Sequence, residues 1–418
     1  MKVLTSANVA TLVNTMLKNA EGTTTTTDGA TADGLIVKED LRNLVEAGET
    51  LSNLITLENF RNVVTGMLEG VGKILYENAK LSSPSRFDIF IDYNEFMTVI
   101  EKVRISAIEF EQSYIYNGAA GVGSTFADMF NNHPLTFTVK VWNTIATYRT
   151  KPFTISMKQL KSSCMNTEEL TRLIGQIYAV VETTYYMAIR EAEKRVIMNQ
   201  IANCAMYNSG ALVVDVLKVY KDTTGTTLTT QTYKTSDEFK RWFYGYFAHV
   251  KMLMGEISGN YNTEKNLINT DSEDMRAFIL EPFYTSLRTI SVYQNGEYYK
   301  DALEGVKVIP FIENINEPDK VYVMPCGDNL PVITSGKHIT GVKVTDIIGM
   351  IWDKRGTLVT ATDIEAGVQN NDFDKWTNYV NNFSVREMCD KGSNAIVFVA
   401  HDASGATTAI AFDEESDT

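Results

Sequence analysis

The chain has 418 residues, which is enough for one large core or for two to three domains of roughly 100 to 200 residues. Hydrophobic residues make up 44% and charged residues 22%, so wholesale disorder is excluded. The net charge of -14 repels phosphate backbones and anionic membranes, which disfavours a dedicated nucleic-acid binder. We find no apolar run of about 20 residues and no signal peptide, and we expect a protein made in the cytoplasm without a membrane partner.

Residues 1–80 are predicted to form an N-terminal arm with helices. Apolar residues recur at helical spacing over Val9–Leu17 and again over Phe60–Leu75. The threonine-rich tract Gly22–Gly29 lies between them, and its composition cannot build a core. Pro84 ends the second helical pattern.

Between residues 81 and 160 the hydrophobic period changes to that of strands. We expect strands over Phe87–Ile91, Val103–Phe110 and Leu135–Trp142, which are rich in β-branched and aromatic residues. The glycine-rich segment Gly118–Gly123 separates the last two. The pattern predicts an extended β-hairpin with a flexible tip.

One very long helix is predicted from about Thr167 to Asn203, which corresponds to roughly 55 Å. Asn166 is the expected N-cap, with Glu169 three residues later. The expected buried stripe consists of Leu170, Leu173, Ile174, Ile177, Val181, Tyr185, Ala188, Ala192 and Val196.

The remaining chain mixes helices and strands, so the fold class is predicted to be α+β. A polar, threonine-rich loop is expected over Asp222–Thr235, followed by an aromatic helix from about Ser236 to Ser258. The predicted strands are Val306–Phe311, Val321–Met324, Asp346–Trp352, Gly356–Thr360 and Ala395–Ala400.

This order of elements resembles the HK97-like fold shared by the capsid proteins of tailed phages. The resemblance includes the strand Phe137–Trp142, the segment Lys151–Leu160 that leads into the long helix, and the turn Asn208–Gly210 after it. It implies a non-enzymatic major capsid protein that self-assembles into an icosahedral head around double-stranded DNA. The implied partners are copies of the chain in hexamers and pentamers, a scaffolding protein and a portal protein. The expected location is the virion capsid, assembled in the host cytoplasm.

The resemblance also implies a domain organisation. Residues 1–80 form the arm with its helices, 81–160 the extended loop and the start of a peripheral domain, and 161–210 the spine helix of that domain. Residues 211–340 are mainly an axial domain. Residues 341–418 supply the closing strands of the peripheral domain and a C-terminal tail.

No residue pattern indicates a catalytic, cofactor or metal site, and no small-molecule substrate is expected. The histidines His133, His249, His338 and His401 are scattered singly. The four cysteines, Cys164, Cys204, Cys326 and Cys389, form no CxxC spacing and are interpreted as buried free thiols. Four basic residues on the predicted hairpin arms are candidates for contacts with neighbouring subunits: Arg86, Arg104, Arg149 and Lys151.

Two alternatives remain open at this point. The chain could be another assembly protein, such as a tail sheath or a compartment shell. It could also be a hydrolase with a dispersed carboxylate site, because acidic pairs occur at Glu168–Glu169, Asp372 and Asp374, and Glu414–Glu415.

Overall fold

The computed structural model describes residues 85–91, 100–105, 137–142, 145–149, 153–156, 158, 167–206, 211–293, 303–323, 337–371, 376–401 and 409–416. The chain divides into two compact units, each built from separate stretches of sequence. The first contains the described parts of Met1–Met97, Thr144–Arg195 and Leu358–Glu387. The second contains those of Thr98–Asn143, Val196–Thr357 and Met388–Thr418. The helices predicted within residues 1–80, the glycine-rich segment and the turn at 208–210 lie outside the described residues.

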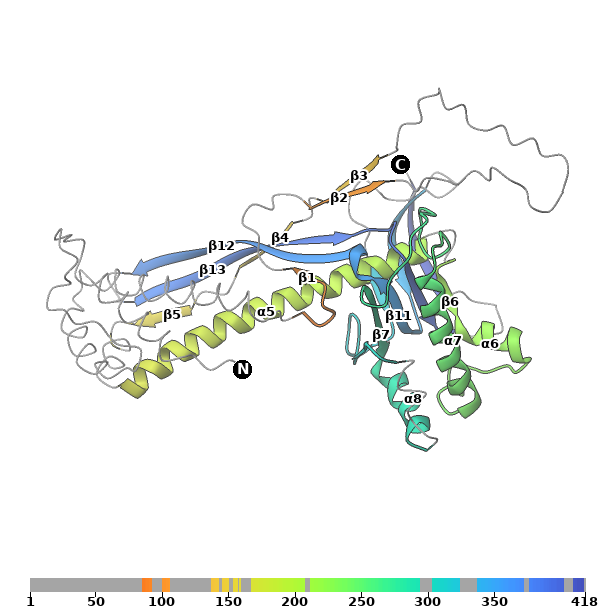
Figure 1. Cartoon of the computed structure of the whole chain (residues 1–418). Coiled ribbons are helices and arrows are strands. Elements are labelled where there is room, and N and C mark those ends of the chain that lie inside the picture. The colour runs from red at the N-terminus through yellow and green to blue at the C-terminus, as the bar shows by residue number, and fades with distance from the viewer. Residues whose placement is uncertain are drawn as a thin grey trace, which may run out of the picture. The chain divides into compact units, whose positions relative to one another are not determined.

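The helix α5 runs without a break from Thr167 to Met206 (Figure 1), three residues past its predicted end at Asn203. Its described stripe residues are buried as predicted, from Ile177 at 7% exposed to Val196 at 0%. The stripe recurs at helical spacing along the whole segment, which explains why the sequence predicts this element well.

A five-stranded sheet has most of its residues in the first unit, in the order β1-β12-β13-β4, with β5 also paired to β13. Its strands are β1 (Phe90–Ile91), β4 (Ile145–Arg149), β5 (Phe153–Ser156), β12 (Thr357–Asn371) and β13 (Trp376–Cys389). The strand expected over Phe87–Ile91 is therefore shortened, and it pairs in parallel with β12 rather than with the hairpin. Within this unit α5 lies against the sheet, because Arg195 bonds to Glu387 of β13 and to Tyr148 of β4.

The second unit is built on a mixed sheet in the order β6-β14-β11-β7-β8. Its strands are β6 (Val213–Asp215), β7 (Met275–Leu280), β8 (Val306–Ile309), β11 (Ile347–Asp353) and β14 (Ala395–Val399). Every residue of β11 and β14 is buried. These continuous apolar runs are typical of central strands covered on both faces. A second sheet joins β9 (Val321–Val323), β10 (Lys337–Val344) and β15 (Ile410–Ser416) in the order β15-β10-β9.

Besides the end of α5 from Val196 on, the described part of the second unit contains the α-helices α6 (Val216–Thr224), α7 (Asp237–Gly255) and α8 (Glu281–Tyr293). The hydroxyl of Ser236 accepts a hydrogen bond from the amide of Phe239 and so caps α7 at its predicted start. The carboxylate of Asp215 caps α6 in the same way, and Gly225 ends that helix with a φ of 75°. The loop expected from Asp222 therefore begins after α6.

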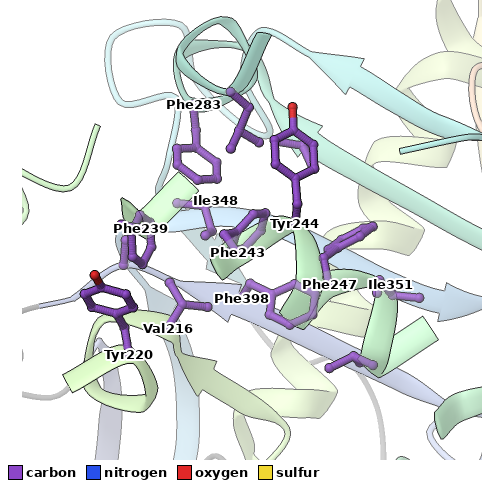
Figure 2. Close-up of a cluster of buried hydrophobic side chains, with 14 of the residues drawn as sticks. Val216, Tyr220, Phe239, Phe243, Tyr244, Phe247, Phe283, Ile348, Ile351 and Phe398 are labelled. Atoms are coloured by element: carbon purple, nitrogen blue, oxygen red, sulfur yellow. The ribbon is translucent and has the colours of Figure 1, made fainter. Parts of the chain in front are cut away.

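An aromatic core fills the space between these helices and the mixed sheet (Figure 2). Phe243 of α7 is fully buried, and the centre of its ring lies 5.0 Å from that of Phe283 and 6.2 Å from that of Phe398. Both contacts have the edge-to-face geometry that aromatic pairs prefer. The expected α+β class is thus seen directly in the structure.

Candidate functional site

The hairpin of β2 (Ile100–Ile105) and β3 (Phe137–Trp142) has two chemically different faces. The antiparallel register places Lys102 opposite Lys140, and Val103 opposite Val139. Because directly opposed residues share a face and neighbours along a strand alternate, one face carries Lys102, Arg104 and Lys140, and the other is mainly apolar, with Glu101 opposite Val141 as its charged member. β3 lies within the predicted strand Leu135–Trp142, whereas β2 begins at Ile100, three residues before the predicted strand Val103–Phe110.

The basic face of the hairpin binds a buried carboxylate in its own unit. The side chain of Asp390, which follows β13, is 0% exposed. Its Oδ2 lies 2.7 Å from Nζ of Lys102 and 3.2 Å from the guanidinium of Arg104, and its Oδ1 lies 2.9 Å from Nζ of Lys140. Both strands of the hairpin are therefore held by one carboxylate.

A second carboxylate and a tight turn complete this arrangement. Glu264 lies 2.5 Å from Nζ of Lys140 and 3.7 Å from the guanidinium of Arg104. The amide of Gly392 and the hydroxyl of Ser393 each donate a hydrogen bond of 3.0 Å to the buried carboxylate. We call the five charged side chains, Lys102, Arg104, Lys140, Glu264 and Asp390, the hairpin root cluster.

The charges of the root cluster fix the protonation state of its central group. Burial by itself raises the pKa of Asp390, but the charge and hydrogen bond of Lys102 lower it, as do hydrogen bonds from Lys140 and the amide of Gly392. The net result is a pKa well below the ordinary value for an aspartate. The carboxylate is therefore ionised at any pH near neutrality, and its cationic partners remain bound.

The opposite face of the hairpin is apolar and open to solvent. Val103 and Phe137 are each 58% exposed, and Val139 and Val141 are each 56% exposed. Single exposed apolar side chains are common on protein surfaces, but here four of them lie together on one face of a two-stranded ribbon.

The four basic residues singled out from sequence do not form one group. Arg104 belongs to the root cluster of the second unit. Arg86 and Arg149 belong to the first unit: the side chain of Arg86 is exposed, and Arg149 pairs with Asn382 in the sheet. Lys151 lies outside the described residues. Whether any of the four contacts a neighbouring subunit remains a prediction.

Sequence reasoning missed most of the root cluster. Lys102 immediately precedes the predicted strand Val103–Phe110 and is two residues from Arg104, so an earlier start of that strand would have placed both on one face. Asp390 gave no comparable signal, because it lies in a short turn that is 288 residues from Lys102 in the chain.

Other polar groups do not assemble into a metal or membrane site within the described ranges. In these ranges no three His, Cys, Asp or Glu side chains are placed to hold a metal ion. None of the helices described is long and apolar enough to cross a membrane. Cys204 and Cys389 are free thiols, and the other two cysteines lie outside the described part of the chain.

Comparison with known families gives one match that covers nearly the whole sequence. Residues 13–399 match the model of the Phi29-like phage major capsid protein family. The chain belongs to this family. As a member of the Phi29-like family it is a structural protein of the phage capsid and not an enzyme, and its place is the virion capsid, where copies form an oligomeric shell.

Solved structures of phage particles are also similar to the chain. A chain of the capsid of Staphylococcus phage Andhra is 11% identical, with a TM-score of 0.46, over 75% of this chain and 84% of that one. A chain from the structure of the head fiber and inner core protein gp22 of native bacteriophage P68 is 9% identical, with a TM-score of 0.45, over 74% and 83%. No curated protein sequence matches. The α+β class and the HK97-like order of hairpin, long helix and sheets agree with membership of the Phi29-like family.

Proposed function

We propose that copies of this chain assemble through hexamers and pentamers into an icosahedral head that encloses double-stranded DNA. A scaffolding protein and a portal protein take part, and assembly takes place in the host cytoplasm. The net charge of -14 supports enclosure without sequence-specific binding, since an acidic wall repels the packed phosphates. The division into an N-terminal arm, a peripheral domain and an axial domain is part of the same proposal.

The observation that carries the proposal is the apolar face of the hairpin. Four large apolar side chains at 56% to 58% exposure are unfavourable in water and promote aggregation of a free chain. In a shell they become part of an interface when a second copy covers them, as obligate interfaces do with surfaces that resemble a core. The four basic residues predicted at subunit contacts, Arg86, Arg104, Arg149 and Lys151, belong to this proposal, with Arg104 contributing through its hold on the hairpin.

The proposal is tested by placing a charge on this face. In the full-length chain, Val139→Asp puts a carboxylate into the expected interface, and Val139→Thr is the matched control because it keeps the β-branched shape. We expect closed shells from the wild type and from Val139→Thr, and unassembled, folded subunits from Val139→Asp. Sedimentation velocity and negative-stain electron microscopy distinguish these products, and circular dichroism reports on folding.

Two results contradict the proposal. Shells at wild-type yield from Val139→Asp would show that the apolar face is not an interface. Tubes instead of closed shells from the wild type would favour a sheath-like assembly over an icosahedral head.

A further inference from the structure

We propose that Asp390 fixes the hairpin β2–β3 to its own subunit before any neighbour binds, so that the apolar face is already oriented when subunits meet. This inference rests on the proposed function, because it concerns how the hairpin is presented for assembly. The role assigned to Asp390 is that of a positioning residue.

The first argument is the symmetry of the contacts across the hairpin. Lys102 and Lys140 are directly opposed in the antiparallel register, where two like charges destabilise a strand pair. Asp390 lies between them, 2.7 Å from one ammonium and 2.9 Å from the other. The carboxylate thus converts a repulsive cross-strand pair into a bridge, and the root of the hairpin is stable because it is docked.

The second argument is that the acceptor is fixed before the hairpin arrives. Hydrogen bonds from Gly392 and Ser393 orient the carboxylate, and the amide of Asp390 itself donates to the carbonyl of Gly356 at 2.8 Å. Lys102 also donates to the carbonyl of Arg355 at 2.9 Å. All of these groups belong to the same compact unit as the hairpin. The carboxylate of Asp390 is therefore already oriented to accept hydrogen bonds from the side chains of the hairpin.

The third argument is the cost of the undocked state. With the hairpin displaced, the carboxylate would lose all three of its cationic partners and keep only the hydrogen bonds from Gly392 and Ser393. The side chains of the cluster are only 19% to 27% exposed apart from the fully buried aspartate, so salt screens them weakly. The docked hairpin is accordingly the expected state of the free subunit.

A close approach at Gly392 makes this docking possible. A Cβ atom at this position would lie 2.6 Å from a guanidinium nitrogen of Arg104 and closer still to the carboxylate of Glu264. Both neighbours are the ends of flexible side chains, so an added methyl group displaces the cluster without entering the core. Gly392→Ala is therefore a mild second variant that acts on the same contacts.

The test measures hydrogen exchange in the unassembled full-length chain. In Asp390→Asn, amides of β2 and β3 are expected to exchange at least roughly tenfold faster than in the wild type, while amides of β11 and β14 keep their protection. Asp413→Asn is the matched control, because Asp413 is an exposed carboxylate of the same unit that bonds the hydroxyl of Tyr322 at 2.9 Å. It should leave exchange in the hairpin unchanged.

A rescue variant separates a positioning role from general destabilisation. Adding Lys140→Met to Asp390→Asn removes the like-charge repulsion, so exchange in the hairpin should slow again, although not to the wild-type rate. Gly392→Ala should give an intermediate acceleration, and it replaces Asp390→Asn if that variant does not fold.

Hairpin exchange at the wild-type rate in the folded Asp390→Asn variant, or in Gly392→Ala if Asp390→Asn does not fold, would overturn the inference. The proposed function is judged separately by the shells formed from Val139→Asp, since the exchange experiment involves no assembly.

Discussion

The backbone amide of Arg86 donates a hydrogen bond of 2.8 Å to Oε2 of Glu193 in the middle of α5. The hydroxyl of Ser85 donates to the other carboxylate oxygen, and Glu193 is only 1% exposed. A charged side chain of the long helix therefore anchors the segment that leads into β1.

Replacing this anchor should weaken the first unit. Glu193→Gln keeps one acceptor oxygen and places an amide group opposite a donor, so the free energy of unfolding should fall by about 1 to 3 kcal/mol. Glu191→Gln, at an exposed position of the same helix, should change it by less than about 0.5 kcal/mol. Chemical denaturation of unassembled subunits measures both, and equal losses would contradict the anchoring role.

The same residue predicts a pH dependence with a definite sign. Burial raises the pKa of Glu193 above its ordinary 4.5, and the hydrogen bonds from Ser85 and Arg86 offset this only in part. A raised pKa in the folded state contributes stability below pH 4.5, and this contribution is lost as the pH rises through the folded-state value. The stability difference between the wild type and Glu193→Gln should therefore shrink as the pH increases from about 4 to neutrality. A difference that grows over this range would contradict the assignment.

The central strand β11 has no room for a side chain at Gly349. A Cβ atom there would lie 2.6 Å from the carbonyl oxygen of Phe278 on the neighbouring strand. Because backbone cannot move aside cheaply, Gly349→Ala should lower the free energy of unfolding by about 1 to 3 kcal/mol. Gly245 is the control: it lies in α7 with nothing within 4 Å of such an atom, so Gly245→Ala should stabilise the protein by about 0.5 to 1 kcal/mol. Thermal melting of the two variants should give shifts of opposite sign.

The aromatic core of the second unit should be sensitive to the loss of one ring. Phe243→Ala removes a fully buried ring in edge-to-face contact with Phe283 and Phe398, at an expected cost of about 3 to 5 kcal/mol. Met252, on the same helix, is 74% exposed, so Met252→Ala should change stability by less than about 0.5 kcal/mol. Similar midpoints in urea for the two variants would show that the core is not packed as described.

The side chains of Arg195 and Glu387 should show a measurable coupling free energy. Nε of Arg195 lies 3.1 Å from the carboxylate, whose side chain is 7% exposed, and the guanidinium also bonds Tyr148. A double-mutant cycle with Arg195→Met and Glu387→Gln should give a coupling energy of about 0.5 to 3 kcal/mol. The pair of Glu317 and Lys320 lies on the surface, and the same cycle there should give no measurable coupling. Equal results at the two sites would contradict the difference in burial.

Periodic elements of the fold could be predicted from sequence, whereas elements without a clear period could not. The long helix and the start of α7 at Ser236 follow from regular apolar spacing and a capping residue. The strand predicted over Gly356–Thr360 is longer in the structure, where β12 runs to Asn371. Its later residues are mostly polar, so the sequence did not indicate a strand there, and pairing with neighbouring strands keeps them extended. The helices α6 and α8 were not predicted. The 9 residues of α6 are too few for a clear apolar period, although Asp215 and Gly225 mark its two ends.

The candidate site was predictable only in part. The hairpin arms and Arg104 follow from alternation along the strands, but the buried partner of the basic face does not. Asp390 is recruited by tertiary structure, and one sequence without its fold cannot show that a turn residue meets a strand so distant in the chain.

The position of β14 sets a constraint on biosynthesis. This strand, Ala395–Val399, lies between β6 and β11 in the mixed sheet, although β6 is made more than 150 residues earlier. Until the ribosome has released residue 399, β6 has no partner and one edge of β11 is open. The apolar strand edges of a nascent chain therefore stay uncovered during this time. Co-expression of a chaperone, or expression at low temperature, should raise the yield of folded protein.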